Sequence, residues 1–282
     1  MLISHLRGGK MKKFIALGGD GRTEFMAQHL REKGFNTEIL YDINKISSCE
    51  AFILPLPFTE DNINIKGTNI NIKNFIESIN NNAVIFAGKL NNEIEMIFKN
   101  KEIVFYDYNT REEFAQKNAV PTAQGVLTFV LNNTNVTLNL LKIAVIGYGK
   151  CGKAICKSFK KQGADVLSYS RRYSTAADAE SDGLKAFLIK DINETIKDVD
   201  IIVNTVPVKI IDENILDSLN INTMIIDISS YPYGFDYNYA KKINRKINLL
   251  PSMPGKYVPK SAGIIIAETI INIIEEGGLW KE

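Results

Sequence analysis

Three glycines in the second half of the chain have the spacing of a phosphate-binding turn. They lie in the sequence GYGKCG, residues 147–152, between an apolar run and a segment of helical periodicity. The first glycine permits a tight turn, the second lets a pyrophosphate approach the backbone, and the third lets the helix pack closely on the strand. We therefore expect a dinucleotide at this helix N-terminus, the alternative being a related turn that has lost its ligand. The loop residues assigned to it are Gly147, Tyr148, Gly149, Lys150, Cys151 and Gly152.

The residues after the next strand indicate which dinucleotide is bound. An NAD site places Asp or Glu roughly 20 residues beyond the glycine turn, where the carboxylate bonds the ribose 2′-hydroxyl. Here the sequence VLSYSRR ends instead in Ser170, Arg171 and Arg172. A hydroxyl and two guanidinium groups suit a dianionic 2′-phosphate, so the sequence favours NADP. We expect Ser170 and Arg171 to make the contact and Arg172 to face solvent; alternatively, both arginines are solvated at a strand end.

Further cofactor contacts are expected where later strands end. In an open α/β sheet, the carboxyl ends of the strands face the ligand crevice. This rule places Thr205, Val206 and Pro207 beside the adenosine or the nicotinamide ribose, and it places Asp227 and Ser229 near the nicotinamide. Loop geometry and strand capping are the alternative roles for these five residues.

Both halves of the chain contain the parallel sheet that such a site requires. Short apolar strands alternate with helical patterns, which is typical of α/β domains. Strands are predicted at residues 12–17, 37–41, 51–54, 83–87 and 102–106, and again at 140–146, 164–169, 186–189, 201–205, 224–228 and 247–249. We expect an N-terminal Rossmann-like or flavodoxin-like α/β domain, followed by a doubly wound NAD(P)-binding Rossmann domain.

Two helices set the predicted domain boundaries. Pro121 suits the first turn of a helix that ends near Asn133 and bridges the domains, and a C-terminal helix near residues 262–276 would pack back towards the first domain. The predicted division is a mis-started leader at 1–10 with translation beginning at Met11, a substrate domain at 11–120, the bridging helix and linker at 121–137, the NADP domain at 138–260 and the C-terminal helix at 261–282. The substrate cleft is expected between the two domains.

The composition excludes several classes of function. The 34 Lys and Arg residues nearly balance 32 Asp and Glu residues, so the net charge of +2 gives no reason to expect nucleic acid or a membrane as partner. The 3 cysteines lack the spacing of a disulfide framework or a zinc site, which favours a reducing cytoplasm and no metal. The only histidines are His5, in the expected leader, and His29, in a predicted helix, which disfavours a dehydrogenase that uses a histidine acid/base.

Seven segments together resemble the family of the dipicolinate synthase A subunits of endospore-forming bacteria. They are IALGGDGR (15–22), ILPLP (53–57), NAVPTAQG (118–125), KIAVIGYGKCGKAI (142–155), DIIVNTVP (200–207), IIDISSYPYG (225–234) and LPSMPGKYVPKSAG (250–263). The glycine turn is common to many families, whereas PTAQG and PGKYVPKSAG are much more specific. The resemblance covers nearly the whole chain from Met11.

This resemblance implies an oxidoreductase that forms dipicolinate, pyridine-2,6-dicarboxylate, from a dihydrodipicolinate-type product of the lysine pathway. It also implies a partner, a flavoprotein-like B subunit, in the cytoplasm of a sporulating mother cell. Removing a hydride completes an aromatic ring, so no histidine base is required, and no acid/base residue is assigned. By position on the matching motifs, the substrate-binding candidates are Arg22, Thr122, Gln124, Lys256, Lys260 and Ser261.

Several alternatives stay open at this point. Thr122 is expected at a helix N-terminus, where it could bind an anion or merely cap the helix, and Lys260 and Ser261 could serve the dipole of the last helix. Arg22 lies in the turn GGDGR, which could face the substrate or be an ordinary surface turn. An NADP-dependent reductase of another small carboxylate, similar to shikimate dehydrogenase, is a second possible function. A nucleotide-binding regulatory subunit without turnover is a third, and a homo-oligomer is also possible.

Overall fold

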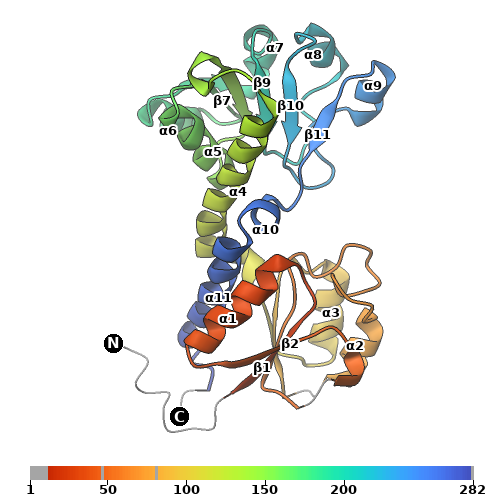
Figure 1. The fold of residues 1–282 in the computed structure, drawn as a ribbon. Coiled ribbons are helices and arrows are strands. Elements are labelled where there is room, and N and C mark those ends of the chain that lie inside the picture. Colours follow the sequence, from red (N-terminus) through yellow and green to blue (C-terminus); the bar gives the residue numbers. More distant parts are fainter. Residues whose placement is uncertain (1–11, 46–47, 80–81, 281–282) are drawn as a thin grey trace. The chain divides into compact units, whose positions relative to one another are not determined.

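The structure is a computed structural model, in which residues 12–45, 48–79 and 82–280 are described. The expected leader at residues 1–10, together with Met11, lies outside these ranges. The chain divides into two compact units, each with its own sheet (Figure 1). Unit 1 combines the described parts of Met1–Asn118 and Val258–Glu282, and unit 2 is Ala119–Tyr257.

The sheet of unit 1 is parallel and has its first strand near the middle. Its strands are β1 (Lys13–Leu17), β2 (Asn36–Leu40), β3 (Ala51–Ile53), β4 (Val84–Ala87) and β5 (Phe105–Asp107). The spatial order is β2-β1-β3-β4-β5, which is the flavodoxin-like order, and all pairs are parallel. The strand order changes direction between β1 and β3, because β2 lies on one side of β1 whereas β3, β4 and β5 follow on the other. The loops after β1 and β3 therefore flank the crevice where ligands bind in such folds.

Alternate residues of β1 bury against opposite layers of helices. Phe14 and Ala16 belong to the core under α1 (Gly21–Glu32) and α11 (Pro259–Glu276), whereas Ile15 and Leu17 face α2 (Ile72–Ser78) and α3 (Asn92–Asn100). The short 3-10 helices η2 (Ile43–Lys45) and η3 (Tyr108–Thr110) complete this unit.

Close contact between α1 and α11 depends on Gly263. A Cβ atom at this position would meet the carbonyl oxygen of Arg22, and it would lie 2.9 Å from Met26 N. Because such contacts are too short for any side chain, only glycine lets the two helices approach this closely. The glycine of the KSAG motif therefore serves helix packing.

The sheet of unit 2 has the strand order of a dinucleotide-binding fold. Its strands are β6 (Lys142–Ile146), β7 (Asp165–Ser170), β8 (Lys185–Leu188), β9 (Ile201–Asn204), β10 (Met224–Asp227) and β11 (Ile247–Leu249). The spatial order β11-β10-β9-β6-β7-β8 corresponds to the 3-2-1-4-5-6 order of the Rossmann fold read from the other edge, and every pair is parallel. This confirms the predicted doubly wound fold with six strands.

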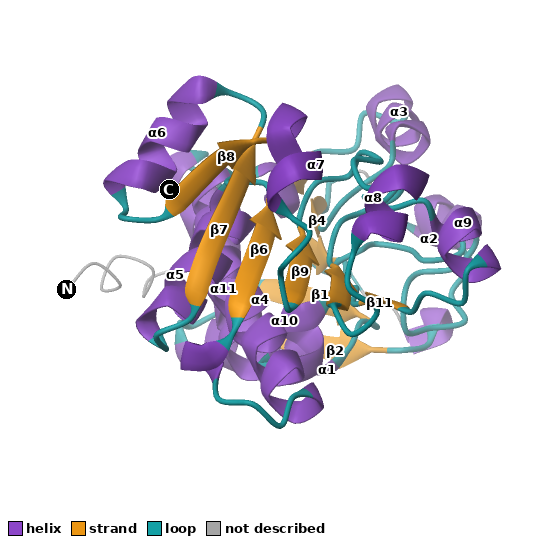
Figure 2. Cartoon of the chain, turned by 90° about the horizontal axis from the view of Figure 1, so that it is seen from above, coloured by secondary structure: helices purple, strands orange, loops and turns teal. Residues whose placement is uncertain are grey.

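Helices cover both faces of this sheet (Figure 2). Ile143 and Val145 of β6 pack with α5 (Lys150–Lys161), α6 (Tyr173–Ser181) and the second half of α4 (Glu112–Asn133), whereas Ala144 and Ile146 face the other layer. That other layer contains α7 (Ile192–Thr195), α8 (Glu213–Ser218) and α9 (Tyr237–Lys242). The remaining short elements of the unit are η4 (Leu138–Leu140), η5 (Ile189–Asp191) and α10 (Met253–Tyr257).

The predicted start of the bridging helix is wrong. Pro121 lies inside α4, which runs from Glu112 to Asn133, instead of opening it. Proline in a helix interior cannot donate to the carbonyl four residues earlier, a local cost that tertiary packing can outweigh. Here Phe114 and Val126, on either side of the proline, are both buried in hydrophobic cores. Thr122, expected at a helix N-terminus, is consequently an interior helical residue.

A second difference concerns the strand predicted at residues 102–106. The chain turns first, since Glu102 has a φ of +55° and the N–H of Ile103 donates to the carbonyl of Phe98, which closes the end of α3. The strand starts only at Phe105. Among the described helices, not one combines the length and the apolar character that crossing a bilayer requires.

Candidate functional site

The first and third glycines of the GYGKCG loop are required by backbone packing. Gly147 has a φ of +95°, and a Cβ there would meet the hydroxyl of Thr205 and lie 2.7 Å from Val206 Cγ2. A Cβ on Gly152 would overlap the carbonyl oxygen of Gly147. The turn after β6 and the start of α5 are therefore packed so tightly that neither position accepts a side chain.

Gly149 differs from these two glycines because the space beside it is open. It is the N-cap of α5, with a φ of −80°, and a Cβ built on it would have no neighbour within 4 Å among the described residues. Within the same ranges, no side-chain hydrogen bond caps this helix. The first N–H groups of α5 are thus available to an anion, beside a glycine that leaves room for it. This arrangement fits the pyrophosphate of a dinucleotide.

The loop lies at the topological switch point of unit 2. β6 pairs with β7 on one side and with β9 on the other. The residue after β9, Thr205, donates from its backbone N–H and from its Oγ1 to the carbonyl of Ile146, both at 2.9 Å. The hydroxyl of Thr205 thus links the loop after β9 to the end of β6, beside Gly147. Val206 and Pro207 continue the same loop, and Pro207 is exposed.

The side chains of Tyr148 and Cys151 contact protein groups beside the loop. The Tyr148 hydroxyl donates to Asp182 Oδ2 at 2.7 Å, and burial together with this bond raises the pKa of the phenol. Cys151 forms a side-chain hydrogen bond with Thr122 of α4, and burial raises the pKa of its thiol. Both side chains therefore stabilise the loop through bonds to protein groups, which leaves its backbone N–H groups for an anion. Lys150 is exposed in the first turn of α5.

The predicted 2′-phosphate residues follow directly after β7. Ser170 is 3% exposed and its Oγ donates to the carbonyl of Arg172 at 3.2 Å, so it holds the turn in shape. Arg171 and Arg172 are exposed, and neither makes an ion pair within the described ranges. These two guanidinium groups at the carboxyl end of β7, the strand beside the glycine loop, are available to a phosphate.

Asp227 is the centre of a buried hydrogen-bond network at the end of β10. Its carboxylate is fully buried and accepts four bonds, from Asn204 Nδ2 (2.9 Å), Ser229 N (2.9 Å), Gly234 N (3.0 Å) and the Tyr237 hydroxyl (3.1 Å). Since these four protein donors match the acceptor sites of one carboxylate, Asp227 organises the loop after β10. The structure thus favours the loop-geometry role considered for this residue.

Asn204 extends the same network to the loop after β9. Its Oδ1 accepts from Val206 N at 3.1 Å and its Nδ2 donates to Val206 O at 3.0 Å. The sequence prediction did not single out Asn204, Gly234 or Tyr237. Asn204 and Gly234 carried a signal only through their position in the DIIVNTVP and IIDISSYPYG motifs, and Tyr237 lies beyond both motifs.

Ser229 is the exception in this loop. It is 8% exposed, and its Oγ is a buried polar atom without a hydrogen-bond partner among the described residues. A buried hydroxyl without a partner is unfavourable and commonly marks a place where a ligand or water completes the bonding. Of the residues predicted near the nicotinamide, Ser229 is the one whose polar group is available.

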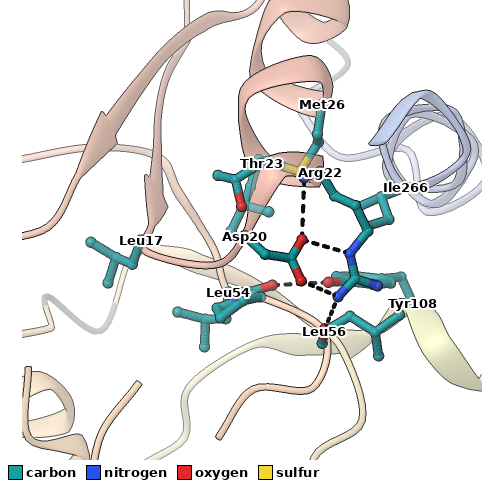
Figure 3. A pocket seen from close by; sticks show the side chains of 11 residues that line it. Leu17, Asp20, Arg22, Thr23, Met26, Leu54, Leu56, Tyr108 and Ile266 are labelled. Atoms are coloured by element: carbon teal, nitrogen blue, oxygen red, sulfur yellow. Dashed lines mark hydrogen bonds and ion pairs between the residues drawn. The ribbon is translucent and has the colours of Figure 1, made fainter. Parts of the chain in front are cut away.

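Arg22 of unit 1, predicted to bind substrate, is already paired in the structure (Figure 3). Its Nε donates to Asp20 Oδ1 at 2.8 Å, its Nη2 donates to Asp20 Oδ2 at 2.7 Å, and Nη2 also contacts the carbonyl of Leu56. The Arg22 side chain is only 6% exposed. Arg22 therefore joins the loop after β1 to the loop after β3, and its charge is neutralised by Asp20.

The cavity beside this pair is too small for an organic substrate. Its volume is about 10 Å³, and Tyr108 closes one side while donating to the carbonyl of Leu54 at 3.0 Å. That volume is about what a single water molecule needs. The switch point of unit 1 is thus filled by protein groups in this conformation.

Asp20 is expected to make the stability of unit 1 depend on pH. Burial raises the pKa of Asp20, but hydrogen bonds and charge from Arg22, with the charge of Lys66, outweigh burial and lower it from 3.8 to about 2. The ionised Asp20 therefore stabilises the folded state at pH values above the pKa that Asp20 has in the unfolded chain. This stabilisation is lost as the pH falls towards the lower pKa that Asp20 has in the folded state. In urea unfolding, the free energy of unfolding of wild type should exceed that of Asp20→Asn at pH 6, and this difference should decrease by about 1 kcal/mol at pH 2.5, after allowance for solvent screening. A pH-independent difference would contradict this.

The other substrate candidates fall into two groups. In unit 1, Lys260 and Ser261 are exposed in the first turn of α11, close to the start of α1, since a Cβ on Gly21 would lie 3.4 Å from Pro259. In unit 2, Gln124 on α4 and Lys256 on α10 are exposed, and these helices touch where a Cβ on Gly125 would lie 3.1 Å from Met253. Thr122 is 7% exposed. Within the described ranges, no group of His, Cys, Asp and Glu has the arrangement of a metal site.

Comparisons with known proteins agree with this geometry. The family described as acetohydroxy acid isomeroreductase, NADPH-binding domain, matches residues 137–268, and the family of the N-terminal domain of the dipicolinate synthase A subunit matches residues 13–109. The A subunit of dipicolinate synthase from Bacillus subtilis (strain 168) is 28% identical over 285 residues, which is 94% of this chain and 96% of that protein.

Solved structures show the same relationship. The crystal structure of the dipicolinate synthase A subunit from Bacillus halodurans aligns with a TM-score of 0.85 at 26% identity, covering 94% of this chain and 99% of the other. The crystal structure of its counterpart from Bacillus subtilis aligns with a TM-score of 0.83 at 26% identity, covering 97% and 99%. The chain is thus similar over nearly its whole length to the A subunit of dipicolinate synthase, which confirms the resemblance predicted from its motifs, and its second unit is an NAD(P)-binding Rossmann domain.

Proposed function

We propose that the protein oxidises a dihydrodipicolinate-type intermediate to dipicolinate with NADP, together with a flavoprotein-like B subunit. The observation that carries the proposal is the match of both units to the A subunit of dipicolinate synthase, combined with a glycine loop whose geometry suits a dinucleotide. The description of the family that matches unit 2 names NADPH, which supports the choice of NADP over NAD.

The residues of unit 2 have distinct tasks in this proposal. When bound, NADP supplies the hydride acceptor. The open backbone at Gly149 and the N–H groups of α5 bind the pyrophosphate, and Arg171 neutralises the 2′-phosphate at the end of β7 while Arg172 faces solvent. Ser170 shapes that turn, and Ser229 offers a hydroxyl that no described group bonds, on the loop after β10.

The substrate carries two carboxylates, so cations and neutral donors must orient it. Of the six candidates, Gln124, Lys256, Lys260 and Ser261 have exposed side chains that can reach a ligand. Arg22 and Thr122 act indirectly in the present conformation, because each is engaged with a protein group. We propose the exposed residues as candidate carboxylate ligands of their own units, Gln124 and Lys256 in unit 2 and Lys260 and Ser261 in unit 1, and Arg22 as a positioning residue.

The proposed reaction does not require an imidazole base. Hydride removal that completes an aromatic ring is driven by aromatisation, and this also assists the accompanying loss of a C–H proton. His29, the one histidine within the described ranges, contacts Glu268 Oε1 at 2.5 Å and so links α1 to α11. No role as a catalytic base is therefore assigned to it. By the same resemblance, we propose the cytoplasm of a sporulating mother cell as the location.

A reconstituted assay tests this function. The purified chain, with and without the flavoprotein-like partner, is given NADP and the condensation product of pyruvate and aspartate semialdehyde, and the ultraviolet absorbance of dipicolinate is followed. We expect product with the wild-type pair and none with a pair carrying Gly149→Asp. Product that persists with this variant would indicate a regulatory subunit without turnover. Absence of product with any pair, despite NADP binding, would favour a reductase of another small carboxylate.

Arg171→Ala is expected to weaken NADPH binding much more than NADH binding. The substitution removes an exposed guanidinium from the proposed 2′-phosphate site, and a charge-assisted bond of this kind contributes about 1.5–3 kcal/mol, or about 10- to 150-fold in Kd. Fluorescence titration with each nucleotide measures the two losses. Lys161→Ala, on the last turn of α5 away from the loop, is the control and should change neither Kd. Equal losses for NADPH and NADH would place the phosphate contact elsewhere.

A further inference from the structure

A second pocket of unit 2 opens at the edge of the sheet where the strands begin. It has a volume of about 320 Å³ and is lined by residues 223–225 at the start of β10, by residues 244–246 and 248 at the start of β11, and by the C-terminal end of α4. Figure 1 shows β10 and β11 as neighbours. The glycine loop follows the end of β6, and all strands of this sheet are parallel. The pocket therefore lies at the N-terminal ends of the strands and the dinucleotide site at their C-terminal ends.

Arg245 is the central charged group of this pocket. It is 8% exposed, and its Nη2 donates to the carbonyl oxygens of Asn220 at 2.5 Å and Thr223 at 3.3 Å. Throughout the described ranges, no carboxylate lies within ion-pair distance of its guanidinium. Burial lowers the pKa of Arg245, and no charged neighbour in the described part of the chain opposes that effect.

The bonding of this guanidinium is incomplete. An arginine side chain has five N–H donors, and the two carbonyl bonds use those of Nη2 alone. The other guanidinium nitrogens are not among the buried atoms without a partner, so they reach accessible space. A buried cation without a counter-ion is unfavourable, and a bound carboxylate would supply both the opposite charge and the acceptors.

The rest of the lining indicates the body of the ligand. Phe129 of α4, Met224 of β10 and Ile221, which is 76% exposed, provide an apolar wall, while Lys246 adds a second positive charge. The volume lies at the lower end of the range for small-molecule sites. Apolar surface beside two basic side chains is suited to a ligand with a compact apolar body and one acidic end.

We propose that this pocket binds a small carboxylate with a flat apolar or aromatic body, through Arg245 and Lys246. The site is separate from the dinucleotide site and does not depend on the proposed reaction. Phe129 of α4 lines the pocket, and Thr122 of the same helix bonds to Cys151 of the glycine loop. A ligand in the pocket would therefore contact a helix that also contacts the glycine loop.

Calorimetry with 4-bromobenzoate and its neutral counterpart 4-bromobenzamide tests the proposal on the full chain. We expect the carboxylate to bind at least about ten-fold more tightly than the amide, because only the former pairs with the buried guanidinium. Arg245→Gln should remove this preference, and Lys246→Gln should weaken the carboxylate by about 2- to 5-fold. Lys241→Gln, an exposed lysine of α9 outside the pocket, should leave both affinities unchanged.

Crystals soaked in 4-bromobenzoate give an independent readout if Arg245→Gln does not fold. An anomalous bromine peak in this pocket, lost in crystals of Lys246→Gln or reduced in occupancy, supports the proposal. Equal binding of acid and amide, an unchanged preference in Arg245→Gln, or a bromine peak only elsewhere on the protein overturns it.

Discussion

Gly149→Asp is expected to weaken NADP binding by at least about 100-fold without destabilising the protein. The N-cap of α5 has no side-chain hydrogen bond, and a Cβ at Gly149 meets no atom within 4 Å, in the described part of the chain. Aspartate is a preferred N-cap residue, so the folded state should tolerate it or gain slightly. Its carboxylate, however, would occupy and repel the position assigned to the pyrophosphate.

Gly152→Ala is the matched comparison. It adds a smaller group than Gly149→Asp, at the third glycine of the same loop, and it is expected to lower the stability of the protein. Its Cβ would overlap the carbonyl oxygen of Gly147, and the contact is with backbone, so no side chain can move to relieve it. We expect a loss of about 2–4 kcal/mol in the free energy of unfolding.

Urea unfolding of the apo proteins and titration with NADP separate the two effects. Gly149→Asp should unfold at the wild-type urea concentration and fail to bind, whereas Gly152→Ala should unfold earlier. If Gly149→Asp binds NADP normally, the pyrophosphate does not lie at the N-terminus of α5. If Gly152→Ala is as stable as wild type, the loop can relax, and the packing role assigned to this glycine is wrong.

The geometry of the glycine loop could be predicted in detail because it is determined locally. Each glycine acts through backbone atoms within a few residues, or through a strand order that alternating strands and helices already suggest. The structure gives positive φ and close packing at Gly147 and backbone contact at Gly152, as the turn and packing roles require, and open space at Gly149, where the pyrophosphate contact stays a prediction. The Asp20–Arg22 pair is equally local, but the sequence prediction missed it and assigned Arg22 to the substrate, although an aspartate before a helix is a cap signal.

The helix containing Pro121 could not be predicted in the same way. The local rule for proline favours a helix start, and residues 112–120 do not by themselves outweigh it. The continuous helix is held by buried residues on both sides of the proline, and their burial depends on the hydrophobic cores to which they belong. Tertiary packing therefore overrides local propensity at this position.

The pocket around Arg245 also depends on tertiary structure. Its lining comes from segments far apart in the sequence, such as those of Phe129 and Ile221. The lack of a carboxylate near the guanidinium, among the described residues, is likewise a property of the folded chain. In the sequence, Arg245 is one basic residue in a run of lysines and asparagines. Burial distinguishes it from the residues that flank it, which are partly or fully exposed.

Asp227→Ala is expected to cause a large loss of stability. The carboxylate is fully buried and accepts bonds from Asn204, Ser229, Gly234 and Tyr237, so its removal leaves four donors without an acceptor. Leaving buried donors unpaired costs more than the net strength of the bonds, because the groups were already removed from water. We expect a decrease of about 3–5 kcal/mol in the free energy of unfolding.

Two further substitutions distinguish this network from a simple cavity. Tyr237→Phe removes one of the four bonds and should cost about 1 kcal/mol. Asp227→Asn keeps the shape but turns an NH₂ group towards some of the donors, so it should fall between Tyr237→Phe and Asp227→Ala. Urea unfolding of the apo proteins measures all three. If Asp227→Ala lowers the free energy of unfolding no more than Tyr237→Phe does, the loop after β10 holds its shape without the carboxylate. Asp227 would then be free to serve the nicotinamide side of the site, as its position at the end of β10 first suggested.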